Sequence, residues 1–179
     1  MVKQNRFNSE TVSLSLTSGM GSYKLLLDDA FDFDFKLIAI HCSLEQYRLA
    51  FLINKYAGLR LASSDDVSFY ARKLKYSFGT MRYEDSKNYL NYTLISNHFK
   101  LRYSQMLKEN VLFAESEHSK TFNLVPEVKG ADYLLKIESD EENAPCTKLL
   151  GQLNRIPHII TAYQIEVSAL KSKQNLIFE

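Results

Sequence analysis

The sequence is poor in several residue types, and each shortage excludes a class of protein. Its 179 residues include two cysteines, three prolines, six glycines and no tryptophan. Two cysteines cannot form the disulfide framework of a small secreted protein, and so few prolines and glycines exclude a collagen-like or low-complexity chain. No apolar run approaches the ~20 residues that a membrane-spanning helix needs, and the apolar residues at 12–16 are too few for a signal-peptide core. We therefore expect a cytoplasmic protein with no membrane partner.

The chain also lacks an excess of charge of either sign. The chain has 22 Lys plus Arg against 21 Asp plus Glu, a net charge of +1, which removes the simplest argument for a nucleic-acid or anionic-membrane partner. Its 45% hydrophobic and 24% charged residues are typical of a folded chain. Aromatic residues, in contrast, are plentiful, with 11 Phe and 11 Tyr. We expect a flexible N-terminal extension over residues 1–22 and a single α+β domain over residues 23–179.

Hydrophobic periodicity predicts the first half of that domain. Residues 30–42 alternate between apolar and polar, as a strand does, and turn apolar on both faces at 38–40. Ser43 and Gln46 fit a capping box that opens a helix over 44–57, and Gly58 suits its end. After a turn at 63–66, three strand-like runs follow at 67–75, 76–83 and 89–99, the last two joined by a polar loop. In the third run we expect Leu90 and Tyr92 to face the core and Thr93 and Asn97 to face water.

The C-terminal third repeats the order of strand, helix and strand. Residues 131–138 alternate, Pro145 suits the start of a helix that Pro157 ends, and residues 159–167 alternate again. Two helices cannot cover both faces of so large a sheet. We therefore predict an α+β, two-layer sandwich: a mainly antiparallel sheet with two helices on one face, a partly wet opposite face, and the topology of an extended ferredoxin-like plait.

One stretch of the sequence resembles a known family. Residues 125–133 read Val-Pro-Glu-Val-Lys-Gly-Ala-Asp-Tyr. They resemble the signature of the IPExxxVDY family, small uncharacterised bacterial proteins named for that motif, with Pro126, Glu127, Asp132 and Tyr133 matching it position for position. Val and Ala stand where the motif has Ile and Val. The resemblance extends over roughly residues 23–179; it implies a single-domain, cytoplasmic bacterial protein and assigns no activity, ligand or catalytic residue.

The motif residues allow two interpretations. Pro126 forces an extended residue before it, and Asp132 and Tyr133 begin a strand, so Glu127 and Asp132 could meet at the strand entrance near the Tyr133 hydroxyl. Such a pair of carboxylates would be a candidate catalytic site. Alternatively, the two acids bond to local backbone N–H groups at a junction between loop and strand, which is the more common arrangement. The absence of a His, Lys or Arg at a readable spacing also favours this second interpretation.

Other clusters of polar residues also allow two interpretations. Four carboxylates at 28–34 have the chemistry that Mg²⁺ or Ca²⁺ prefers, but alternation with Phe explains them as the wet face of a strand, and we expect no metal. Cys42 and Cys146 lie near helix starts, where a thiol pKa can fall; two buried, inert thiols are the more common outcome. No phosphate-binding loop is present, and we expect no cofactor.

A basic and aromatic stretch at 69–83 is the remaining candidate. Arg72, Lys73 and Lys75 lie among Phe and Tyr residues, a combination that can hold phosphates and stack bases. Strand alternation, however, divides these cations between two faces. Three functions therefore stay open: a non-enzymatic binding or interaction module with a protein partner or self-association, an RNA or single-stranded nucleic-acid binding domain, and an enzyme with a carboxylate site at Glu127 and Asp132. The sequence favours the two that are not enzymatic.

Overall fold

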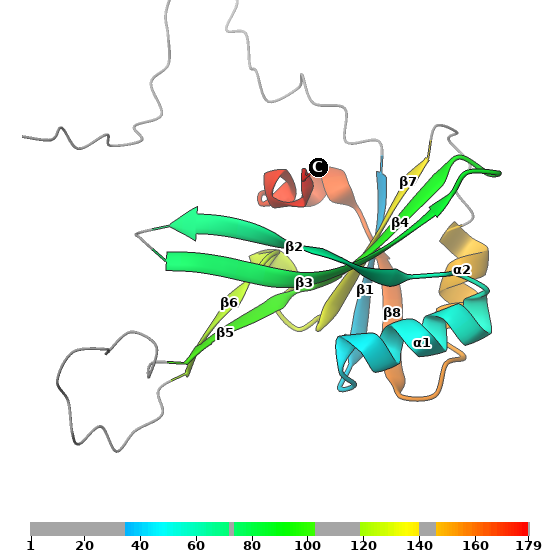
Figure 1. Cartoon of the computed structure of the whole chain (residues 1–179), viewed down its shortest axis with the longest axis horizontal. Helices are drawn as coiled ribbons and strands as arrows, with labels where there is room; N and C mark the ends of the chain where they lie inside the picture. Colours follow the sequence, from blue (N-terminus) through cyan, green and yellow to red (C-terminus); the bar gives the residue numbers. More distant parts are fainter. Residues whose placement is uncertain (1–34, 72–73, 103–118, 140–145, 179) are drawn as a thin grey trace, which may run out of the picture. The chain divides into compact units, whose positions relative to one another are not determined.

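The computed structural model describes residues 35–71, 74–102, 119–139 and 146–178 (Figure 1). The predicted N-terminal extension lies outside them. The described elements are, in chain order, β1 (Phe35–Cys42), α1 (Gln46–Ala57), β2 (Ala62–Ala71), β3 (Leu74–Asp85), β4 (Leu90–Ser96), β5 (His98–Arg102), β6 (Ser119–Asn123), the 3-10 helix η3 (Pro126–Val128), β7 (Tyr133–Ser139), α2 (Cys146–Leu153), β8 (Ile159–Ile165), and the 3-10 helices η4 (Val167–Ala169) and η5 (Lys173–Leu176).

Six of the strands form one sheet in the order β2-β3-β4-β7-β1-β8, and every neighbouring pair is antiparallel. Strands β5 and β6 form a separate two-stranded sheet. The prediction of an α+β fold with a mainly antiparallel sheet is confirmed. Strands β4-β7-β1-β8 with the two helices have the arrangement of a ferredoxin-like plait, and β2 and β3 extend it.

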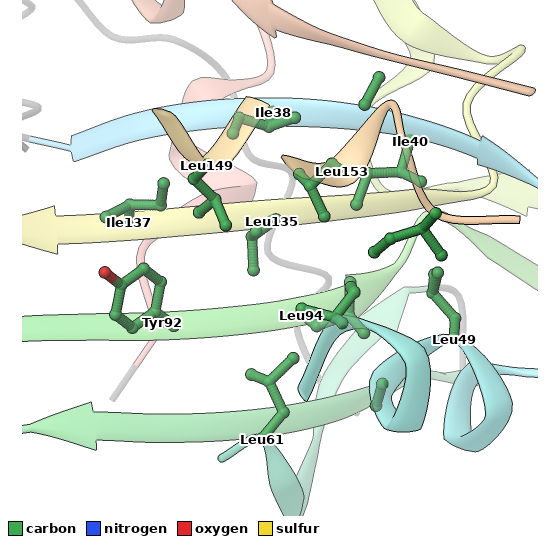
Figure 2. Packing of buried hydrophobic residues seen from close by; sticks show 14 of the residues in the cluster. Ile38, Ile40, Leu49, Leu61, Tyr92, Leu94, Leu135, Ile137, Leu149 and Leu153 are labelled. Atoms are coloured by element: carbon green, nitrogen blue, oxygen red, sulfur yellow. The ribbon is translucent and has the colours of Figure 1, made fainter. Parts of the chain in front are cut away.

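One face of the sheet packs against both α-helices. Leu49 and Ile53 of α1 and Leu153 of α2 are fully buried, and they pack in one cluster with the side chains that Figure 2 shows on β1, β4 and β7. Burying one such aliphatic side chain contributes roughly 1.5–3 kcal/mol to folding. Because the apolar stripe of each helix was visible in the sequence, this face was predicted correctly.

Helix α1 begins differently from the prediction. Its N-cap is Glu45, and no side chain caps it. Gln46 does not complete a capping box; its Nε2 donates instead to the carbonyls of Gly79, at 2.8 Å, and Leu94, at 3.1 Å. Residue 79 must be glycine for this contact, since a Cβ there would collide with the Gln46 amide. Gly58 ends the helix in the left-handed conformation, with φ +74°, as predicted.

The opposite face of the sheet is not wet at its centre, which corrects the prediction. Thr93 and Asn97, both expected in water, are 4% and 0% exposed, and Lys136, the cross-strand partner of Thr93, is 3% exposed. Residues 124–131 and the C-terminal segment with η4 and η5 cover them, and bury Leu124 and Leu176 against this face. These covering segments are irregular, so no apolar periodicity announces them. The sheet therefore has helices on one face, and irregular segments cover the centre of its other face.

Lys136 shows how a cation is accommodated on that covered face. Its Nζ lies 2.6 Å from Glu138 Oε1, and 4.7 Å and 4.9 Å from the ring centroids of Phe35 and Phe178. A carboxylate and two aromatic faces replace the water that the ammonium loses. The C-terminal segment therefore covers a charged residue without leaving it unpaired.

Part of the aromatic excess joins the two sheets. Tyr76 of β3 contacts Phe99 of β5 and Phe122 of β6, with ring centroids 5.7 Å and 4.6 Å apart. Phe78 adds edge or tilted contacts to Phe69 and Phe99. The turn predicted at residues 63–66 is wrong: these residues lie inside β2, at an irregularity in its register.

Candidate functional site

The motif residues lie in a stretch that we call the motif segment, residues 124–133. Glu127, in the 3-10 helix that Pro126 opens, binds the C-terminal segment: Ser172 donates its N–H to Oε1 at 2.8 Å and its hydroxyl to Oε2 at 2.6 Å. Desolvation alone would raise the pKa of Glu127, but the hydrogen bonds from the Ser172 side chain and from backbone N–H groups outweigh it and lower the pKa. Its carboxylate thus fastens one segment of the chain to another.

Asp132 and Tyr133 bind the end of β1 and the start of the connection to α1. Asp132 Oδ2 accepts the N–H of Cys42 at 2.9 Å, and Oδ1 lies 3.7 Å from His98 Nε2. The Tyr133 hydroxyl donates to the carbonyl of Leu44 at 2.6 Å. Burial, reinforced by the nearby acidic groups, among them Glu45 and Asp132, raises the pKa of Tyr133 to about 12, so this phenol stays a neutral donor.

The motif segment is also held by a residue that was expected in water. Asn97 is fully buried; its Nδ2 donates to the carbonyls of Val128, at 3.0 Å, and Ala131, at 2.9 Å, while its Oδ1 accepts the N–H of Val125 at 2.9 Å. One amide thus satisfies three backbone groups of an irregular segment. The available signal was position: Asn is unfavourable in strands, and this one stands at the break between β4 and β5.

These bonds determine what the predicted carboxylate site can do. Glu127 is engaged by Ser172 and Asp132 by Cys42, so the two acids have separate partners on different segments. Neither acid lines any of three clefts, of about 590, 330 and 250 Å³, in the described part of the chain. Both accept backbone N–H groups, as in the second arrangement considered from the sequence, but these N–H groups belong to residues 45 and 90 positions away and not to local ones.

The cysteines and histidines show no catalytic arrangement in the described part of the chain. Cys42 and Cys146 are reduced and buried, and desolvation raises the pKa of both thiols, which opposes thiolate formation. His41 stacks on Tyr163 instead of meeting a thiol. Among the described residues, no group of three His, Cys, Asp or Glu could hold a metal ion. The four carboxylates at 28–34 lie outside that part.

Only one of the three predicted nucleic-acid contacts can be placed. Lys75 is exposed on β3 and pairs in register with Tyr70 of β2, whose side chain is 76% exposed. Arg72 and Lys73 lie outside the described residues.

Both open edges of the large sheet are protected. At β8, the side chain of Asn154 accepts the N–H of Ala162 at 2.8 Å and donates to its carbonyl at 2.9 Å, which occupies the middle of that edge. At β2, Asp65 and Asp66 lie at the register irregularity. Charges, bulges and side-chain caps of this kind discourage strand addition.

The outer side of α1 is the most exposed aromatic surface on a described helix. Phe51 is 65% exposed and Tyr47, one turn earlier, is 59% exposed. Arg48 donates from Nε to the Tyr47 hydroxyl at 3.1 Å, and Lys55 stands one turn after Phe51. We call Tyr47, Arg48, Phe51 and Lys55 the aromatic–basic face. A helical projection places it opposite the buried Leu49 and Ile53, so the sequence itself carries this signal.

Comparisons with known proteins add no identity. No protein-family model matches the chain, and no curated protein matches it. The resemblance to the IPExxxVDY family stays a prediction. Within the described ranges, no helix has the length and apolarity needed to cross a membrane.

Proposed function

We propose that this protein is a non-enzymatic interaction module, and that the aromatic–basic face of α1 binds an acidic segment of a partner protein. The exposure of Phe51 carries the proposal. A phenylalanine in the middle of a well-packed helix, with 65% of its surface in water, adds nothing to the core and loses the free energy that burial would give. A partner that covers the ring would recover it.

The arrangement of the neighbours supports an interface. Tyr47, Phe51 and Lys55 succeed one another at intervals of four residues, so they form one stripe along the helix. Aromatic residues and arginine are enriched at the energetically dominant centres of protein interfaces. Because Leu49 and Ile53 fix the inner side of α1, the stripe is presented on a rigid support, which lowers the entropic cost of binding.

Charge indicates the chemistry of the partner. Helix α1 contains Arg48 and Lys55 and no acidic residue, although Glu45 precedes its first turn. Neither cation forms an ion pair within the described ranges. Two copies of this face would bring like charges together, whereas an acidic segment with an apolar anchor would satisfy both cations and rings. This favours a different protein over self-association.

The other predicted functions have less support. For nucleic-acid binding, Lys75 is the one predicted contact with a described position; for an enzyme, Glu127 and Asp132 already accept hydrogen bonds from the chain. Both functions, and the cytoplasmic location, stay predictions.

A displayed library of random peptides tests the proposal without a known partner. Peptides are selected on the full chain and counter-selected on the Tyr47→Ala/Phe51→Ala variant, which should stay folded because both side chains are exposed. We expect the selected peptides to combine Asp or Glu with Leu or aromatic residues. Their affinity should fall at least about tenfold in the variant, as for an interface centre, and should weaken with salt.

The control is Tyr70→Ala, which removes an equally exposed aromatic residue on β2. It should leave peptide affinity unchanged. Selected peptides that are basic, or that bind wild type and the double variant equally, would contradict the proposal. A stable homodimer that the double variant abolishes would show that the occupant is a second copy.

A further inference from the structure

A cleft of about 590 Å³ lies at one end of the helix-covered side of the sheet. The end of α1, the turn between β3 and β4, and α2 form its walls. This volume is within the range of roughly 300–1,000 Å³ that small-molecule sites occupy. Its lining shares no residue with the aromatic–basic face, so whatever it binds is separate from the proposed partner.

One wall of the cleft is aromatic. Tyr83 of β3 and Tyr92 of β4 stack with ring centroids 5.9 Å apart and planes at 12°. Figure 2 shows Tyr92 projecting from β4 on the same side of the sheet as Leu149 of α2, which also lines the cleft. Tyr92 is buried, so it supports the partly exposed Tyr83 from behind. Such a supported ring offers a flat surface for another planar ring.

The mouth of the cleft adds a third tyrosine in an unusual backbone conformation. Tyr89 has φ +50°, a left-handed conformation that side chains other than Gly, Asn and Asp rarely adopt, and its side chain is 69% exposed. Strain of this kind is often retained at ligand sites. Here it holds an aromatic side chain at the cleft with little packing to explain it.

Among the described residues that line the cleft, two lysines and one carboxylate leave an excess of positive charge. Lys87 comes from the turn and Lys148 from α2, both are exposed, and neither forms an ion pair in the described part of the chain. The lining carboxylate, Asp85, already accepts the N–H of Lys87 at 3.3 Å and the Nδ2 of Asn88 at 2.7 Å, because it stabilises the turn. An anionic group between the lysines would find both available.

We propose that this cleft binds a small molecule that combines a planar aromatic ring with an anionic group, the ring against Tyr83 and the anion between Lys87 and Lys148. A nucleoside monophosphate and an aryl carboxylate share this chemistry. They differ in the anion that the lysines would bind, a phosphate in the first and a carboxylate in the second.

Calorimetric titration of the full chain tests the assignment with four probes: AMP, indole-3-acetate, adenosine and inorganic phosphate. We expect saturable 1:1 binding of AMP, of indole-3-acetate or of both, at least about tenfold tighter than adenosine or phosphate alone, because ring and anion contribute together. Which of the two ring-bearing anions binds identifies the anion class.

The Lys87→Ala/Lys148→Ala variant should weaken that binding about tenfold or more, since each lysine contributes a charge-assisted hydrogen bond. Lys75→Ala, which removes an exposed lysine elsewhere on β3, should not change it. Circular dichroism confirms that both variants fold. Absence of saturable binding of both ring-bearing anions at millimolar concentration, or equal affinity in wild type and the double variant, would overturn the assignment.

Discussion

The motif segment and the aromatic–basic face of α1 differ in how their side chains are used. The motif segment holds Glu127, Asp132 and Tyr133, residue types that suggest chemistry, yet each is engaged in a hydrogen bond to another part of the chain. The face of α1 combines two aromatic rings with two cations, and its rings are left in water. A polar motif therefore indicates a functional site only where its atoms are available to a ligand.

The reason lies in the backbone of the motif segment. Between β6 and β7 the chain is irregular apart from one short 3-10 helix, so its N–H and C=O groups lack the ladder that a strand or α-helix supplies. Buried groups of this kind need side-chain partners. Asn97 supplies three such bonds, and Asn175 donates a further one to the carbonyl of Leu124 at 2.9 Å. Polar residues concentrate here because the fold requires them.

Removing Asn97 should have the largest effect. In Asn97→Ala, the N–H of Val125 and the carbonyls of Val128 and Ala131 lose their partner at a fully buried position. We expect the free energy of unfolding to fall by about 3–5 kcal/mol. Chemical denaturation followed by circular dichroism measures it.

Asn154→Ala is the matched control, because that amide also bonds both backbone groups of one residue, Ala162, but from an exposed position. Water can replace it there, so a loss of only about 1 kcal/mol is expected. Equal losses in the two variants would show that burial of the amide does not increase its contribution to stability. That result would contradict the role assigned to Asn97 in the motif segment.

Tyr133→Phe should have an intermediate effect. It removes the hydrogen bond to Leu44, and we expect a loss of about 1 kcal/mol at neutral pH. Because the folded pKa of about 12 lies above the unfolded value of ~10, the contribution of Tyr133 is complete below pH ~10 and disappears as pH rises toward 12. Denaturation measured across alkaline pH should therefore show wild type losing its advantage over the variant and then becoming the less stable of the two as pH rises from ~10 toward 12; parallel curves would mean that the hydroxyl is not buried.

Glu127→Gln should have a smaller effect, since the carboxylate is exposed, and the effect should depend on pH. The hydrogen bonds of Ser172 lower the pKa of Glu127, so its contribution is present above the unfolded pKa of ~4.3 and is lost as pH falls through the folded pKa. Wild type should be more stable than the variant at pH 7 and equal to it in strong acid. A difference that persists in acid would contradict the carboxylate's role.

Phe51→Ala should have the smallest effect on stability, because the ring contacts water more than protein. We expect a change within about 0.5 kcal/mol, which denaturation would detect as an unchanged midpoint. The same variant should weaken the binding of selected acidic peptides. A large loss of stability would mean that Phe51 belongs to the core and has no role in an interface.

The regular part of the fold was predictable, and the irregular part was not. Strand β1, with four consecutive residues fully buried, follows the pattern of a strand that is buried on both faces. The buried residues of the two helices, Leu49 and Ile53 of α1 and Leu149 and Leu153 of α2, follow the helical period. The covered face was missed because residues 124–131 and the C-terminal segment bury isolated side chains without a period. Alternation placed Asn97 and Lys136 on the correct side of the sheet, but sequence gives no sign of what lies above them.

The candidate surfaces were predictable to different degrees. The sequence shows that Tyr47 and Phe51 lie opposite the apolar stripe of α1, since helix geometry is fixed once the stripe is known. It cannot show that Tyr83, Lys87 and Lys148 line one cleft, because they come from elements far apart in the chain. It also cannot show that Glu127 bonds to Ser172, 45 positions later.

An amide NMR titration of the full chain with a selected acidic peptide tests the central claim most directly, because it observes both regions of the comparison in one experiment. The account predicts that resonance shifts concentrate on α1, around Tyr47, Phe51 and Lys55, while the amides of the motif segment, 124–133, stay unchanged. Shifts that concentrate on the motif segment and leave α1 unchanged would contradict it.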